Sequence, residues 1–136
     1  MECPSVMVNQ GTFGEDLTPA IDALKRLKEY GESKNVSVIL EPRGKSTTEV
    51  LLKVIHDAGI YANPDIGNFR DEEGTERGLR LLYPLAKTVS HVKWDPERFD
   101  FAKAIQILRR WASRGCIRSK AAGLNLTPVY KHFWIV

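Results

Sequence analysis

Three residues that can bind a metal ion follow successive apolar runs of the chain. Glu41, Asp65 and His91 stand at the ends of runs that are typical of buried β-strands. Lys93 lies two residues after His91 and therefore on the same face of its strand. Two carboxylates and an imidazole form a hard-to-borderline ligand set, which suits a divalent ion of manganese, cobalt, magnesium or zinc. The placement favours a metal site made of Glu41, Asp65 and His91.

Each of these residues also has a structural interpretation. Glu41 can close a loop, Asp65 can shape a turn, and His91 can be a hydrogen-bonded core histidine. Only their joint position at strand ends favours function, and the spacing by itself leaves both interpretations open.

The elements that must position these residues alternate in type. Strands are expected at residues 5–8, 36–40, 60–62 and 88–93, with amphipathic helices after them. Four such βα units predict an α/β fold with parallel strands, helices packed outside and right-handed connections. A doubly wound sheet and an arc of a (β/α)8 TIM barrel both fit, and a full barrel needs about 250 residues. In either fold the C-terminal ends of the strands share one rim, where the candidate ligands would meet.

Local signals mark the helix ends. Thr18 is expected to cap the first helix, and Gly31 to end it. Ser46 and Glu49 have the spacing of a capping box, and Gly59 suits the end of that helix. The apolar stripe of the last helix is expected to comprise Phe101, Ala102, Ile105 and Leu108.

Composition limits the class of protein. The chain has 136 residues, of which 43% are apolar, so it suits one domain with a real core. No run approaches the roughly 20 apolar residues of a membrane span, and the start lacks the features of a secretory signal. Cys3 and Cys116 fit neither a disulfide framework nor a zinc knuckle. We therefore expect a soluble cytoplasmic protein without a membrane partner.

Four segments resemble the xylose-isomerase-like TIM barrels, which include sugar-phosphate isomerases and epimerases. They are Val38–Gly44, Asn63–Phe69 with its Asp-Ile-Gly-Asn-Phe run, the His-x-Lys segment Val89–Lys93, and Phe99–Leu108. The resemblance covers about residues 5 to 110. It implies a partial barrel domain over residues 1–110, made of the family's strands four to seven, the C-terminal half.

The resemblance also implies roles. Glu41, Asp65 and His91 would bind a divalent metal, Glu41 would be an acid–base partner, and Lys93 would hold a substrate oxygen. The reaction would be metal-assisted proton transfer on a sugar or sugar phosphate, in carbohydrate metabolism. The family's last strand carries a second glutamate, whereas this chain has no acidic residue after Asp100. Pro42 and Arg43 also stand where the family often has Asn-His. We therefore do not expect the chain as it stands to turn over substrate.

The segment 111–136 departs from the family pattern. It belongs to a basic tail, and we interpret it as an ancestral last strand read out of frame, which the nucleotide sequence would decide. The alternative is a divergent tail that docks on the sheet through Val129, Phe133 and Trp134.

Other functions remain open from the sequence. The fragment can be a non-catalytic structural remnant. It can also belong to the endonuclease branch of the same superfamily, although that branch needs more histidines than His56, His91 and His132. The basic tail can attract nucleic acid, which we do not expect as a partner. Exposed sheet edges of a half barrel predict self-association.

Overall fold

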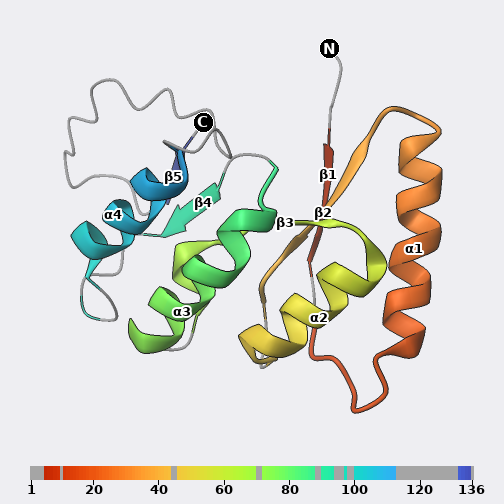
Figure 1. The fold of residues 1–136 in the computed structure, drawn as a ribbon, viewed down its shortest axis with the longest axis horizontal. Helices are drawn as coiled ribbons and strands as arrows, with labels where there is room; N and C mark the ends of the chain where they lie inside the picture. The colour runs from red at the N-terminus through yellow and green to blue at the C-terminus, as the bar shows by residue number, and fades with distance from the viewer. Residues whose placement is uncertain are drawn as a thin grey trace.

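Strands and helices alternate along the chain, as the sequence predicts, and the first three strands are parallel (Figure 1). The structure is a computed structural model that describes residues 5–9, 11–43, 46–69, 72–87, 90–93, 97, 100–112 and 132–135. Strands β1 (Ser5–Asn9), β2 (Ser37–Glu41) and β3 (Tyr61–Ala62) form a parallel sheet in the order β1-β2-β3. An isolated parallel bridge joins Ala62 to Ala86, so the chain leading to the next strand runs beside β3. The fold class is therefore mixed α/β.

The helices follow one another in a row (Figure 1). They are α1 (Thr18–Glu32), α2 (Thr48–Ala58), α3 (Glu72–Leu82) and α4 (Phe101–Ala112), with short 3-10 helices η1 (Ile66–Asn68) and η2 (Tyr83–Leu85). Each α-helix packs against the next one in chain order. None of the helices in the described part of the chain is long and apolar enough to cross a membrane.

The core lies between this row of helices and one face of the sheet. Val38 and Leu40 of β2 belong to it, together with buried residues of the helices such as Leu51, Val54 and Leu79. Because side chains alternate along a strand, Ile39 and Glu41 point to the opposite face. Both are buried as well, so β2 is a continuous apolar run that ends in a glutamate.

The fourth strand differs from the expectation. β4 (Ser90–Lys93) is not hydrogen-bonded to the parallel sheet in the described residues but pairs antiparallel with β5 (His132–Ile135). His91 stands opposite Trp134 in this pairing. A strand can form backbone hydrogen bonds with a parallel or with an antiparallel neighbour. The residues of β4 alone do not determine which of the two it pairs with. The end of the tail thus supplies a strand, while its reading frame stays a prediction.

The helix starts correct two expectations. Thr18 is the first residue of α1 rather than its cap, since the N-cap is Leu17, which has no side-chain hydrogen bond to the helix. The Asp16 carboxylate accepts a hydrogen bond from the Thr18 backbone N–H at 2.9 Å. The cap of α2 is Thr47, whose hydroxyl oxygen accepts from the Val50 N–H at 3.4 Å. Ser46, the expected cap, instead accepts a hydrogen bond from the Phe13 N–H at 3.4 Å.

The helix ends were predicted in one case of two. Gly59 ends α2 with φ +67°, as expected. Gly31 lies inside the last turn of α1, and Asn35 takes the left-handed conformation instead, with φ 56°. The turn folds back so tightly that a Cβ on Gly31 would lie 2.6 Å from the Val36 carbonyl oxygen. Glycine is therefore needed here for a close approach rather than as a stop signal.

The buried face of α4 includes residues outside the predicted stripe and leaves out Ala102. Ala104 and Ile107 are buried, Ile105 is half-buried and Ala102 is exposed. The side chains of Phe101 and Leu108 lie outside the described part of the structure. Packing against α3 therefore buries Ala104 and Ile107, which the predicted stripe did not include.

Candidate functional site

Glu41 is a buried carboxylate at the C-terminal end of β2. Only 2% of it is exposed. Its Oε1 accepts a hydrogen bond from the Asn68 side-chain amide at 3.2 Å, and its Oε2 lies 3.8 Å from Nε of Arg43. An ionised carboxylate in the interior needs such partners, because the low-dielectric interior does not solvate it. The sequence thus places a charged group at a sheet rim and supplies the groups that hold it there.

Asp65 is a second buried carboxylate, three residues after β3. It is fully buried, and its Oδ1 accepts a hydrogen bond from the Gly67 N–H at 2.9 Å. Its backbone carbonyl also accepts from the Asn68 N–H at 3.1 Å. Asp65 is therefore the cap of η1, which confirms its interpretation as a turn residue. A capping role does not exclude a second role, since a carboxylate offers two oxygens.

The short helix η1 connects the two carboxylates. Asp65 starts η1 and Asn68 ends it, and the Asn68 amide reaches Glu41 of the neighbouring strand. The backbone also stays in register up to this point, because the Asn63 N–H donates to the Leu40 carbonyl at 2.8 Å. Glu41 and Asp65 therefore come from the ends of adjacent strands at one end of the sheet, as the sequence predicts.

The side-chain amide of Asn63 is buried close to this pair of carboxylates. The sequence did not single it out as a candidate site residue. Asn63 is 2% exposed, and its amide nitrogen donates to the Met7 sulfur at 3.0 Å. Its Oδ1 has no hydrogen-bond partner among the described residues. Such an orphaned oxygen is unusual in a protein interior, where nearly all polar atoms are paired. Asn68 was missed as well, although both asparagines flank Asp65 in the Asn-Pro-Asp-Ile-Gly-Asn run that the sequence singled out.

His91 and Lys93 belong to β4, whose backbone lies beside η1. The strand therefore passes close to the segment that carries Asp65. The side chains of His91 and Lys93 lie outside the described part of the structure. Within the described residues, no three His, Cys, Asp or Glu side chains are grouped closely enough to hold a metal ion. The predicted three-ligand set thus stays a prediction, with Glu41 and Asp65 as its described members.

The described donors fit a hard divalent ion in their chemistry. Carboxylate and amide oxygens are the ligands that manganese and magnesium prefer. One oxygen of Glu41 and one of Asp65 accept hydrogen bonds from Asn68 and Gly67, and bonds of this kind orient ligands around metals. Arg43 acts in the opposite sense, because its positive charge beside Glu41 competes with a cation.

No protein-family model matches this sequence, and comparison with curated proteins finds no significant match.

Proposed function

We propose that this chain is an arc of a (β/α)-barrel of the sugar isomerase and epimerase type, with a divalent-metal site at the rim that carries Glu41 and Asp65. Two features of the architecture support the barrel over a doubly wound sheet. The strands are neighbours in chain order, and the bridge from Ala62 to Ala86 continues that order. The helices pack in the same order in one row. A doubly wound sheet reverses its strand order and covers both faces.

The observation that carries the site is the group of buried polar residues after β2 and β3. Glu41 and Asp65 are 2% and 0% exposed, and the Oδ1 atom of buried Asn63 lacks a partner in the described residues. Two buried carboxylates and an unsatisfied amide oxygen are costly in an apolar core. Their concentration at the end where parallel α/β folds bind ligands favours a polar ligand over pure structure.

The roles follow from the chemistry of these groups. Glu41 and Asp65, with His91, would hold the ion, which would supply positive charge to polarise neighbouring oxygens of a sugar or sugar phosphate. Glu41 would also take up or return a proton at the carbon next to the carbonyl, and Lys93 would hold a substrate oxygen. The second proton-transfer glutamate has no counterpart after Asp100. We therefore expect metal binding from this chain rather than turnover.

A non-catalytic remnant is the second candidate, and one contact favours it. The Arg43 guanidinium lies beside Glu41 and neutralises its negative charge, so a metal ion is not needed for this purpose. Asp65 likewise has a structural task as the cap of η1. In a non-catalytic remnant, these structural contacts alone would explain why the two carboxylates are buried.

Manganese titration by calorimetry tests the metal site. Asp65→Asn keeps an oxygen that accepts from the Gly67 N–H but removes the charge, so the fold should survive. We expect it to weaken Mn²⁺ binding about tenfold or more, the scale of losses at metal sites. Asp22→Asn, an exposed change on α1, is the matched control and should bind as the parent does. Equal affinity in the parent and Asp65→Asn, or no binding by the parent, would refute the proposal.

Arg43→Gln separates the two candidates. If Glu41 is a metal ligand, removal of the competing guanidinium should strengthen Mn²⁺ binding. If the Arg43–Glu41 pair is only structural, the variant should unfold at a lower urea concentration than the parent and should not bind Mn²⁺. Circular dichroism at each step confirms that the variants are folded.

A further inference from the structure

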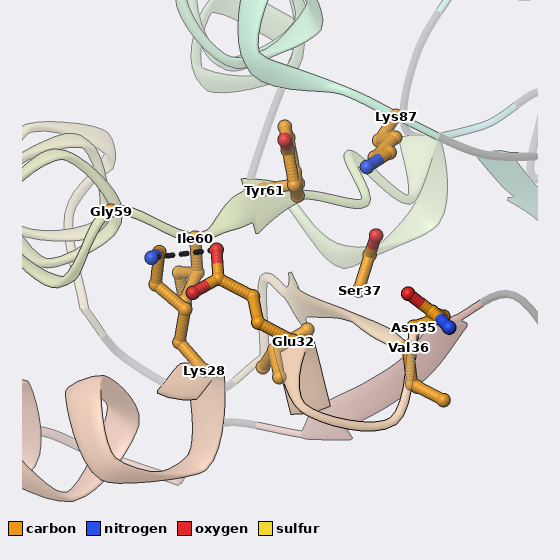
Figure 2. A pocket seen from close by; sticks show the side chains of 10 residues that line it. Lys28, Glu32, Asn35, Val36, Ser37, Gly59, Ile60, Tyr61 and Lys87 are labelled. Atoms are coloured by element: carbon orange, nitrogen blue, oxygen red, sulfur yellow. Dashed lines mark ion pairs between the residues drawn. The ribbon is translucent and has the colours of Figure 1, made fainter. Parts of the chain in front are cut away.

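A pocket lies at the other end of the sheet from the Glu41 rim (Figure 2). Its volume is about 300 Å³. Ser37 and Tyr61 are the first residues of β2 and β3, so the pocket opens at the N-terminal ends of these strands. We call it the N-terminal pocket. Its polar lining consists of Lys28, Glu32, Asn35, Ser37, Tyr61 and Lys87.

Two rigid turns build its walls. In the turn from α1 to β2, the Val36 N–H donates to the Gly31 carbonyl at 2.8 Å and Asn35 is left-handed. In the turn from α2 to β3, the Ile60 N–H donates to the Ile55 carbonyl at 3.2 Å and Gly59 is left-handed. Both have the bonding pattern of a Schellman motif, which fixes the backbone that follows a helix. The pocket is therefore preformed rather than a gap between mobile loops.

The charges in the pocket are divided between two sides. Lys28 Nζ pairs with Glu32 Oε1 at 2.8 Å, and this pairing raises the pKa of Lys28. Figure 2 shows Lys87, Ser37 and Asn35 on the side away from that ion pair. The Lys87 ammonium lies 4.4 Å from the centroid of the Tyr61 ring. With two lysines and one glutamate, the lining carries one net positive charge, and it is supplied by Lys87.

The apolar part of the lining lies among these polar groups. Figure 2 shows Ile60 beside the Lys28–Glu32 pair and Val36 beside Asn35, while Tyr61 is 39% exposed. A ligand that matches the pocket therefore carries one negative charge and a short hydrocarbon part. The volume is at the lower limit for small-molecule sites, which restricts the ligand to a few carbon atoms or one ring.

We propose that the N-terminal pocket binds a small organic monocarboxylate. The carboxylate accepts hydrogen bonds from the Lys87 ammonium and the Ser37 hydroxyl, and the hydrocarbon part lies against the exposed Tyr61. A doubly charged phosphate fits less well, because the lining carries only one net positive charge to offset it. This site shares no residue with the Glu41 rim, so it does not depend on the metal-site proposal.

Benzoate, acetate and inorganic phosphate are the probes for an NMR titration of the full chain. Benzoate should shift the backbone amide signals of Asn35, Ser37 and Tyr61 in a saturable way. Acetate should bind more weakly, because it lacks the ring, and phosphate should bind more weakly than benzoate. Phosphate binding equal to or tighter than benzoate would overturn the monocarboxylate assignment.

Lys87→Gln tests the anion contact. Loss of one charge-assisted hydrogen bond should weaken benzoate binding about tenfold. Lys25→Gln, an exposed lysine on α1 outside the pocket, is the matched control and should leave binding unchanged. Lys87 is exposed, so the variant should fold, and an unchanged amide spectrum elsewhere verifies this. Absence of benzoate-dependent shifts in the parent, or equal affinity in Lys87→Gln, would overturn the proposal.

Discussion

Gly78 sets the position of a residue next to the candidate metal site. It lies in α3, and a Cβ at this position would overlap the ring of Phe69. Phe69 is 7% exposed and follows Asn68, whose amide holds Glu41. The missing side chain of Gly78 thus lets an aromatic ring anchor the end of η1. The glycine is a packing requirement of the site segment, which explains why a helix interior tolerates a poor helix former.

Gly78→Ala should destabilise the protein. The added methyl group must displace the Phe69 ring, and overpacking of this kind costs about 1–3 kcal/mol. That cost should exceed the gain in helix propensity, which is roughly 1 kcal/mol. Urea unfolding measures the difference. Gly14→Ala is the control, since a methyl group on Gly14 would have no neighbouring atom within 4 Å, and it should be neutral. An increase in stability for Gly78→Ala would show that the ring does not pack there.

At the scale of elements, ion pairs connect neighbouring helices on the outer surface. Arg77 of α3 lies 2.6 Å from Glu49 of α2, and Lys103 of α4 lies 2.6 Å from Glu76 of α3. Arg80 adds a second partner to Glu76 within α3. The glutamates therefore interact with cations across both helix–helix boundaries, outside the apolar core. These pairs orient the row of helices more than they stabilise it, because exposed pairs are weak.

The pH dependence of stability should reveal the Glu76 pair. Hydrogen bonds from Lys103 and then Arg80 lower the pKa of Glu76 below its ordinary value of 4.5. A lowered pKa in the folded state means that the pairing stabilises the protein above pH 4.5 and is lost as the pH falls through the folded-state pKa. Glu76→Gln should therefore reduce the melting temperature at neutral pH but flatten its fall below pH 4.5. Parallel pH profiles for the parent and Glu76→Gln would contradict this.

The elements show how far the sequence predicts structure. The three parallel strands and their helices were predictable because apolar periodicity reports which face is buried. The caps were not. Ser46 is as suitable in type as Thr47, the observed cap of α2, and the N-cap of α1 is Leu17, which has no side-chain hydrogen bond to the helix. The choice depends on how the preceding loop approaches the helix, and Ser46, for example, is engaged by the Phe13 backbone.

In the candidate site, too, some features were predictable from the sequence and others were not. The position of Glu41 and Asp65 after adjacent strands was predictable, because strand ends of a parallel sheet meet at one rim, while their role as ligands stays a prediction. Asn63 and Asn68 were not singled out, because their roles depend on η1 and on a cross-sheet contact to Met7. Local sequence does not specify contacts between side chains 27 or 56 residues apart.

At the scale of the whole molecule, the parallel sheet ends at β1. This strand pairs only with β2 in the described part of the chain, and its Val6 and Met7 are 42% and 38% exposed. On α1, Leu27 and Tyr30 are 37% and 65% exposed. Apolar groups therefore remain uncovered on both the sheet and the helix at the same end of the chain.

The pairing of β4 with β5 was unpredictable at this scale, because the partner comes from about 40 residues away along the sequence.

Self-association through the edge of β1 is the expected consequence. An edge strand with apolar side chains is a template for a strand of another molecule, and a lysine on such an edge opposes that pairing. Sedimentation velocity of the 136-residue chain should show a mass that rises with concentration. Val6→Lys should shift the distribution toward the monomer, because it places a charge on the exposed edge. Ala102→Lys, an exposed change on α4, adds the same charge away from this edge and should leave the association as it is. A parent chain that stays monomeric at every concentration would contradict the expectation, and so would an equal effect of the two lysines, which would attribute the association to net charge instead of the β1 edge.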